Sequence, residues 1–229
     1  MERFFNADNG VMRALSKVFD IGWLSLIYVV FCIPLITIGA ATTSLYYVSA
    51  KVLRRGRSYV WTEFWRSFKQ NFAPATLIWV VFAAAFGLLF FNFTIVNNQS
   101  EYGGYLIGVY LALALILLCI MSYAFCVLSR FSMKILQIFR FSLFCAFRHF
   151  AHTLVLLVIL LAGITGIFLP LLFPSPVVQS LVPMILAFVP GTAAFLYTFP
   201  MEHLLKKYTP ESEPRFTEDG ERILEWYEE

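Results

Sequence analysis

The stretch CIPLITIGAATTSLYY, residues 32–47, lies in the middle of a run without charged side chains from residue 21 to residue 50. As one helix this run would be about 45 Å long, whereas the hydrocarbon core of a bilayer is about 30 Å thick. Pro34 removes a backbone donor and disfavours helix at the residue before it, and Gly39 permits a tight turn. We therefore expect two helices that fold back on each other near Pro34 and Gly39.

The composition places this hairpin in a membrane protein. The chain is 60% hydrophobic and 14% charged, whereas soluble domains have about 25% charged residues. Apolar blocks of about 18 or more residues are typical of membrane spans. We expect an all-α polytopic membrane helix bundle with six membrane-embedded helices in a single domain, residues 1–201, followed by a cytoplasmic tail, residues 202–229. The expected helices cover about 16–33, 40–53, 74–96, 105–128, 152–173 and 181–201.

The second arm of the hairpin, 40–53, is short for a full span, so the alternative is five spans. Cytoplasmic segments carry an excess of Lys and Arg. Such residues occur in 49–73, in 129–151 and in the tail, but not in the connectors 97–104 and 174–180. A hairpin places all 17 Lys and Arg and both termini in the cytoplasm. Five spans would place the N-terminus outside.

The two cytoplasmic connectors, within 49–73 and 129–151, have the pattern of amphipathic linker helices. In SYVWTEFWRSFKQNF, residues 58–72, aromatic side chains recur every three or four positions, as expected for a helix that lies in the membrane interface. Packing on the membrane surface is the simpler interpretation, and docking of a cytoplasmic partner is the alternative. The candidate docking residues are Trp61, Phe64, Trp65, Arg66, Phe68, Lys69 and Phe72.

Catalytic patterns are missing from the sequence. We find no GxSxG, P-loop or dinucleotide motif. Beyond the first apolar block the expected spans contain no Asp, Glu, Lys or Arg, which argues against buried proton relays and intramembrane metalloproteases. His149, His152 and His203 are expected at the membrane interface. We expect no enzyme, no cofactor, no metal site and no nucleic-acid partner.

The helix breaks are the candidate solute-binding features, because transporters build sites from interrupted helices. One break is expected at 34–39 and a second at 189–191, although prolines also bend membrane helices without forming a site. The candidate residues are Pro34, Thr37, Gly39, Thr42, Thr43, Ser44, Pro190, Gly191 and Thr192. Small residues four apart, such as Ala83 with Gly87, Gly104 with Gly108, Ala162 with Gly166 and Ala187 with Gly191, indicate close helix packing or a homo-oligomer.

Several short motifs resemble those of the YesL-like family of bacterial integral membrane proteins. The matching positions are Pro34, Thr37–Gly39, Ala41, Leu45–Tyr47, Lys51, Arg54, Phe64, Phe68, Lys69, Asn71 and Phe72. Ala40 stands where many relatives have proline. The resemblance implies a plasma-membrane location, mainly in Gram-positive bacteria, and an association with carbohydrate-utilisation genes beside sugar-uptake permeases. It supplies no catalytic residues.

Together these features predict a multi-pass plasma-membrane protein that is accessory to carbohydrate (oligosaccharide) uptake or utilisation. The alternative is a small transporter or channel for a neutral solute that uses the breaks at 34–39 and 189–191. The expected partners are the lipid bilayer, sugar-uptake permease subunits and a second copy of the chain. The Glu-Ala-Ala…Gly loop typical of permease subunits is absent, so the chain is not expected to be one. In the tail we expect a short helix over 217–226.

Overall fold

The computed structural model describes residues 10–54, 59–99, 103–131, 133–172, 175–208, 215–216 and 222–223. These residues are almost all helical, as the sequence predicts. The elements are α1 (Gly10–Cys32), η2 (Leu35–Thr37), α2 (Ile38–Val48), η3 (Ser49–Leu53), α3 (Val60–Gln99), α4 (Gly103–Arg130), α5 (Ile135–Arg148), α6 (Phe150–Leu172), α7 (Pro176–Leu205), η4 (Lys206–Tyr208), β1 (Arg215–Phe216) and β2 (Arg222–Ile223).

The expected break after α1 is confirmed. Helix α1 ends at Cys32, and the chain passes through Pro34, in extended conformation, into the 3₁₀ helix η2 and then α2. The Thr37 hydroxyl donates to the carbonyls of Phe31 and Pro34, which fixes the turn. Tyr28 of α1 and Thr42 of α2 face each other, with hydroxyl oxygens 3.4 Å apart. The chain therefore reverses direction at Pro34.

Helix α2 is short and lies at the centre of the bundle. It is 11 residues long, and most of its side chains are buried among α1, α3, α4 and α7. Its hydroxyl groups satisfy their hydrogen bonds locally: Thr43 donates to the Gly39 carbonyl at 2.9 Å and Ser44 to the Ala40 carbonyl at 2.8 Å. Buried hydroxyls can be accommodated in this way without another partner.

Five helices, α1, α3, α4, α6 and α7, are long and apolar enough to cross a membrane. Helix α2 is the sixth helix of the predicted bundle, but with the π-helical turn η3 it is only about 24 Å long, at about 1.5 Å per residue. The spanning helices expose large apolar side chains, for example Phe90 at 70% and Leu111 at 66%, which suits contact with lipid.

Helix α3 is longer than the sequence pattern predicted. We expected an interfacial helix before Pro74 and a span after it, but α3 continues from Val60 to Gln99 without interruption. Its 40 residues correspond to about 60 Å, roughly twice the thickness of a bilayer core. A proline in a membrane helix is tolerated when local adjustments satisfy the freed backbone groups.

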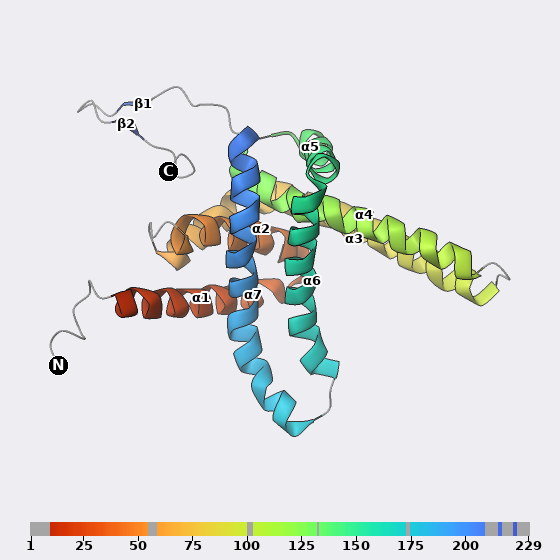
Figure 1. The fold of residues 1–229 in the computed structure, drawn as a ribbon, viewed down its shortest axis with the longest axis horizontal. Coiled ribbons are helices and arrows are strands. Elements are labelled where there is room, and N and C mark those ends of the chain that lie inside the picture. The colour runs from red at the N-terminus through yellow and green to blue at the C-terminus, as the bar shows by residue number, and fades with distance from the viewer. Residues whose placement is uncertain are drawn as a thin grey trace.

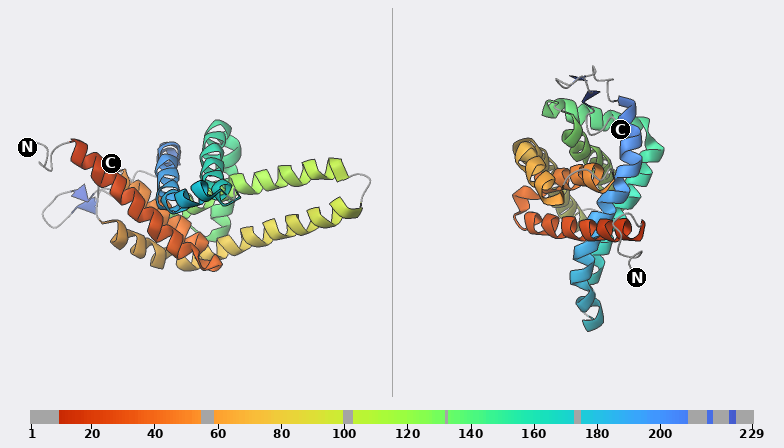
Figure 2. Two further views of the ribbon diagram at one scale, coloured as in Figure 1. Left: turned by 90° about the horizontal axis from the view of Figure 1, so that it is seen from below. Right: turned by 90° about the vertical axis from the view of Figure 1, so that its left-hand side faces the viewer.

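Two helical hairpins diverge from the central region (Figure 1). Helices α3 and α4 run side by side in one direction, while α6 and α7 run side by side in another. Figure 2 shows the same two pairs from other sides, with α1 crossing α7. Helix α5 packs mainly on α4 and joins it to α6.

Three expectations near the C-terminus need correction. Helix α7 is continuous through Pro190, so the predicted break at 189–191 is wrong. The backbone N–H of Gly191 donates instead to the Ser25 hydroxyl of α1 at 2.8 Å. Helix α7 also continues to Leu205, beyond the expected end at residue 201, because Leu204 and Leu205 are fully buried. Residues 222–223 form a strand paired with 215–216, so a helix there is wrong; the rest of 217–226 lies outside the described residues.

Candidate functional site

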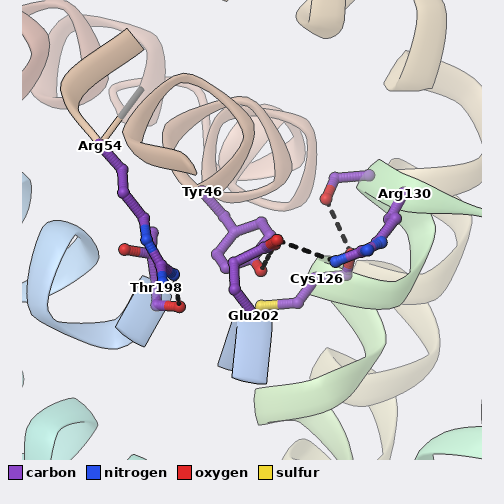
Figure 3. A network of polar contacts seen from close by, with 7 residues as sticks. Tyr46, Arg54, Cys126, Arg130, Thr198 and Glu202 are labelled. Carbon is purple, nitrogen blue, oxygen red and sulfur yellow. Dashed lines mark hydrogen bonds and ion pairs between the residues drawn. The ribbon is translucent and has the colours of Figure 1, made fainter. Parts of the chain in front are cut away.

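A buried carboxylate joins three helices. Glu202 of α7 lies between α2 and α4, and both of its carboxylate oxygens have partners (Figure 3). Tyr46 donates its hydroxyl hydrogen to Oε1 at 2.6 Å, and Arg130 Nη1 lies 2.8 Å from Oε2. The side chains of Arg130 and Glu202 are 1% and 5% exposed, so this ion pair is shielded from water. The Cys126 side chain lies beside the carboxylate (Figure 3).

A second ion pair holds the next turn of the chain against α3. Lys51 Nζ lies 2.9 Å from Oε2 of Glu63, and Tyr47 donates to the same oxygen at 3.2 Å. Arg54 then reaches α7, where Nη1 donates to the Thr198 carbonyl at 2.9 Å (Figure 3).

These contacts assign structural roles to the tyrosine pair and the two basic residues of the sequence motifs. The neighbouring residues Tyr46 and Tyr47 bind carboxylates on different helices. In the same way, Lys51 binds α3 whereas Arg54 binds α7. We call these four residues the α2 clamp. The turn that links the two tyrosines to the two cations is π-helical, with the Arg54 N–H bonded to the Ser49 carbonyl at 3.1 Å. Single π-helical turns are frequent at functional sites.

A cavity of about 170 Å³ lies next to the α2 clamp. It is formed by α1, α2, α4, α6 and α7, and its lining is mostly apolar. The polar groups at its wall are already engaged: Tyr46 is bonded to Glu202, and Tyr197 donates to the Ser122 carbonyl at 2.7 Å. The cavity therefore suits a small, mainly apolar group better than a sugar, whose hydroxyls each need a partner.

The structure brings together only part of the predicted solute-binding set. Thr42 and Pro190, from the two predicted breaks, line the same cavity. Pro34 and Thr192 are exposed, and the hydroxyls of Thr43 and Ser44 are bonded within α2.

Thr37 and the two glycines of that set have structural contacts instead. Thr37 fixes the turn before α2. A Cβ atom at Gly39 would lie 2.5 Å from the Ala75 carbonyl oxygen, and one at Gly191 would lie 2.5 Å from the Ser25 hydroxyl. Both positions therefore allow helices to approach closely, as the small-residue pattern predicts for Gly191. Gly87 and Gly108 have no such neighbour within 4 Å.

The predicted docking residues lie on the first turns of α3 and divide into two sets. Phe64 and Phe68 are buried and pack on Phe31 of α1, with ring centroids 5.3 and 4.9 Å from it. The outer set remains exposed and consists of Trp61, Trp65, Arg66, Lys69 and Phe72.

We call this outer set the α3 aromatic face. Trp61 and Trp65 are stacked, with ring planes 4° apart. The Lys69 ammonium lies 4.7 Å from the Trp65 ring centroid, within the range of a cation–π contact.

Sequence reasoning missed the pairing of Arg130 with Glu202. Both residues were assigned to polar segments at the ends of spans, whereas the structure buries them inside the bundle. The available signal was the apolar pair Leu204 and Leu205, two and three residues after Glu202, which indicates that the helix remains in the core. The partner itself, 72 residues away, has no signal in a single sequence.

Within the described part of the chain, no three His, Cys, Asp or Glu side chains gather so as to hold a metal ion. His149 instead pairs with the Tyr208 hydroxyl at 2.8 Å, and the rings of His152 and His203 stack, with centroids 6.0 Å apart.

Two comparisons find known sequences that are similar to this chain. Residues 21–93 match the model of a family described as "Protein of unknown function, DUF624". The chain is also 25% identical over 169 residues to the "Uncharacterized protein YesL" of Bacillus subtilis (strain 168), covering 72% of this chain and 78% of that protein. No solved structure matches. The family match contains the break at Pro34, the α2 clamp and the α3 aromatic face. Both findings confirm the resemblance that the motifs indicate: the chain is similar to YesL and, over residues 21–93, to this family of unknown function.

Proposed function

We propose that this protein is a non-enzymatic accessory subunit of carbohydrate, in particular oligosaccharide, uptake or utilisation in the bacterial plasma membrane. In this proposal both termini are cytoplasmic, and the α3 aromatic face binds a subunit of a sugar-uptake permease. The carbohydrate role rests on the resemblance to the YesL-like family. The docking role rests on the structure of α3.

The observation behind the docking role is the length of α3 together with the exposure of its first turns. A helix of about 60 Å cannot be covered by a bilayer core of about 30 Å. In this proposal it is the segment before Pro74 that extends beyond the core, and in that segment Trp61, Trp65 and Phe72 are 49%, 37% and 40% exposed. Exposed aromatic rings flanked by a cation are typical centres of protein–protein interfaces.

The cavity supports an accessory role over direct passage of an oligosaccharide. It is small and mostly apolar, and the hydroxyls of Tyr46 and Tyr197 at its wall already have hydrogen-bond partners within the protein. In this proposal the sugar passes through the partner.

A growth experiment tests the proposal. We expect deletion of the gene to slow growth on defined oligosaccharides but not on glucose, and we expect Trp65→Ala with Phe72→Ala to fail in complementation. The matched control is Phe90→Ala with Phe91→Ala, two exposed aromatic residues farther along the same helix. A photo-crosslinker at Trp65 should join the chain to a permease subunit. Normal growth of the deletion strain on every oligosaccharide would refute the carbohydrate role.

A second candidate function is transport of a small neutral solute, which the cavity favours because Thr42 and Pro190 meet there. In that case Thr42→Cys, in a chain whose native cysteines are replaced by alanine, should react with water-soluble thiol reagents. The same substitution at Leu24, which is fully buried, is the negative control. If neither the cysteine at Thr42 nor the one at Leu24 reacts, the transport function is refuted.

A further inference from the structure

We propose that the outer face of α5 binds an anionic phospholipid, with Arg140 and Arg148 on the phosphate and Leu143, Phe144 and Phe147 along an acyl chain. This inference is independent of the proposed function, because it concerns a different helix and a different ligand.

The first argument is the placement of these five residues. They line one open groove on α5, and all of them are exposed. The opposite face of α5, formed by Ile138, Ser142, Cys145 and Ala146, is buried in the bundle. An exposed face with three large apolar residues and two arginines is typical of a helix at the boundary of head groups and acyl chains. Helix α5 has 14 residues, about 21 Å, and is too short to span a bilayer.

The second argument is the direction of the arginine side chains. Arg140, Phe144 and Arg148 are spaced four residues apart and so lie above one another on the helix. The Arg148 guanidinium lies 5.4 Å from the Phe144 ring centroid. This contact directs its charge back along the helix, toward Arg140. Two guanidinium groups on one side of an apolar groove match a phosphate, which arginine binds through paired hydrogen bonds.

The third argument is the lack of compensating charge. The sequence contains no Asp or Glu from residue 102 to residue 201. Among the described residues, neither Arg140 nor Arg148 belongs to an ion pair. An anion from the membrane is therefore the natural partner for these two charges.

Other cations reinforce the positive field at the end of α5. The Tyr208 ring packs on Phe141 and Phe144, with centroids 5.4 and 6.2 Å apart, and so brings η4 with Lys206 and Lys207 to this end of the helix. The pKa of His149 lies below its usual value, first because of burial and then because of the charges of Lys207, His152 and Arg148. Basic sites of this kind between membrane helices bind the head groups of anionic lipids.

Native mass spectrometry of the full chain tests the inference, with phosphatidylglycerol and phosphatidylcholine of equal acyl-chain length as probes. We expect tighter retention of phosphatidylglycerol. Arg140→Gln with Arg148→Gln should lower that preference by about fivefold for each arginine, since a cation near an anionic surface contributes about 1 kcal/mol. The control is Lys17→Gln with Lys134→Gln, which removes the same charge from exposed positions outside the groove. It should leave the preference unchanged.

Three outcomes would overturn the inference. Equal losses in both double variants would show that net charge alone attracts the lipid. Unchanged preference in the α5 variant would show that its arginines are not the site. Displacement of the lipid by an equal concentration of glycerol phosphate would show a site for free phosphate. If the glutamine variant does not fold, Arg140→Lys with Arg148→Lys should keep part of the preference, because lysine retains charge but not paired hydrogen bonding.

Discussion

Tyr46 and Tyr47 are adjacent in the chain, yet they contact Glu202 and Glu63 on different helices. Successive side chains on a helix are about 100° apart, so one short helix can bind partners on two sides. Tyr46 places its ring in the apolar core, the half-buried ring of Tyr47 packs against that core, and each hydroxyl lies on a carboxylate. The two residues therefore fix both the position and the rotation of α2.

Removal of one partner of the buried ion pair should be severely destabilising. Glu202→Ala leaves the charge of Arg130 buried without its carboxylate, which typically costs about 3 to 5 kcal/mol. Arg130→Met with Glu202→Met should recover much of this loss, because an apolar pair needs no compensating charge. Denaturation of the purified protein in detergent measures both effects. A Glu202→Ala variant as stable as wild type would show that the ion pair does not hold α4 and α7 together.

At the scale of elements, apolar block length and aromatic spacing predicted the helices that are long enough to span and the helical start of α3. Pro34 predicted the break before α2. The sequence did not predict that α7 is continuous through Pro190, because the Ser25 hydroxyl that bonds the next N–H is 166 residues away. It also did not predict which charged residues at the ends of the expected spans are buried. Arg130 and Glu202 meet only after α4 and α7 pack near α2. Such pairings depend on tertiary contacts that a local pattern does not contain.

Glycine positions provide a test of helix packing. Gly191→Ala should be destabilising by about 1 to 3 kcal/mol, because its Cβ would lie 2.5 Å from the Ser25 hydroxyl and 2.6 Å from the Ile21 carbonyl oxygen. Gly87→Ala gains the same helix propensity but meets no atom within 4 Å. It should leave stability unchanged or slightly higher. Thermal unfolding of both variants makes the comparison, and equal midpoints would contradict close packing of α1 on α7.

At the scale of the whole molecule, the reversal at Pro34 determines which side of the membrane the N-terminus occupies. The hairpin of α1 and α2 returns the chain toward the side from which α1 starts. This arrangement agrees with the predicted placement of all 17 Lys and Arg in the cytoplasm.

Accessibility labelling in intact cells tests this topology. Single cysteines are introduced by Lys17→Cys, Lys134→Cys and Gln179→Cys, at exposed positions, in a chain whose native cysteines are replaced by alanine. A membrane-impermeant maleimide should label the Gln179 position in intact cells and the other two only after permeabilisation. Labelling at the Lys17 position in intact cells would place the N-terminus outside.

The shortness of α2 also has a consequence for biogenesis. A segment of 11 helical residues is too short to partition into a bilayer by itself, since a helix needs about 20 apolar residues to span the core. Its buried hydroxyls and the two tyrosines that bind carboxylates make it a still poorer substrate for independent insertion. Helix α2 must therefore enter together with α1, as one helical hairpin, and acquire its partners on α3, α4 and α7 as those helices are synthesised. Substitutions that straighten the turn at Pro34 would then act during insertion, before a folded state exists to be destabilised.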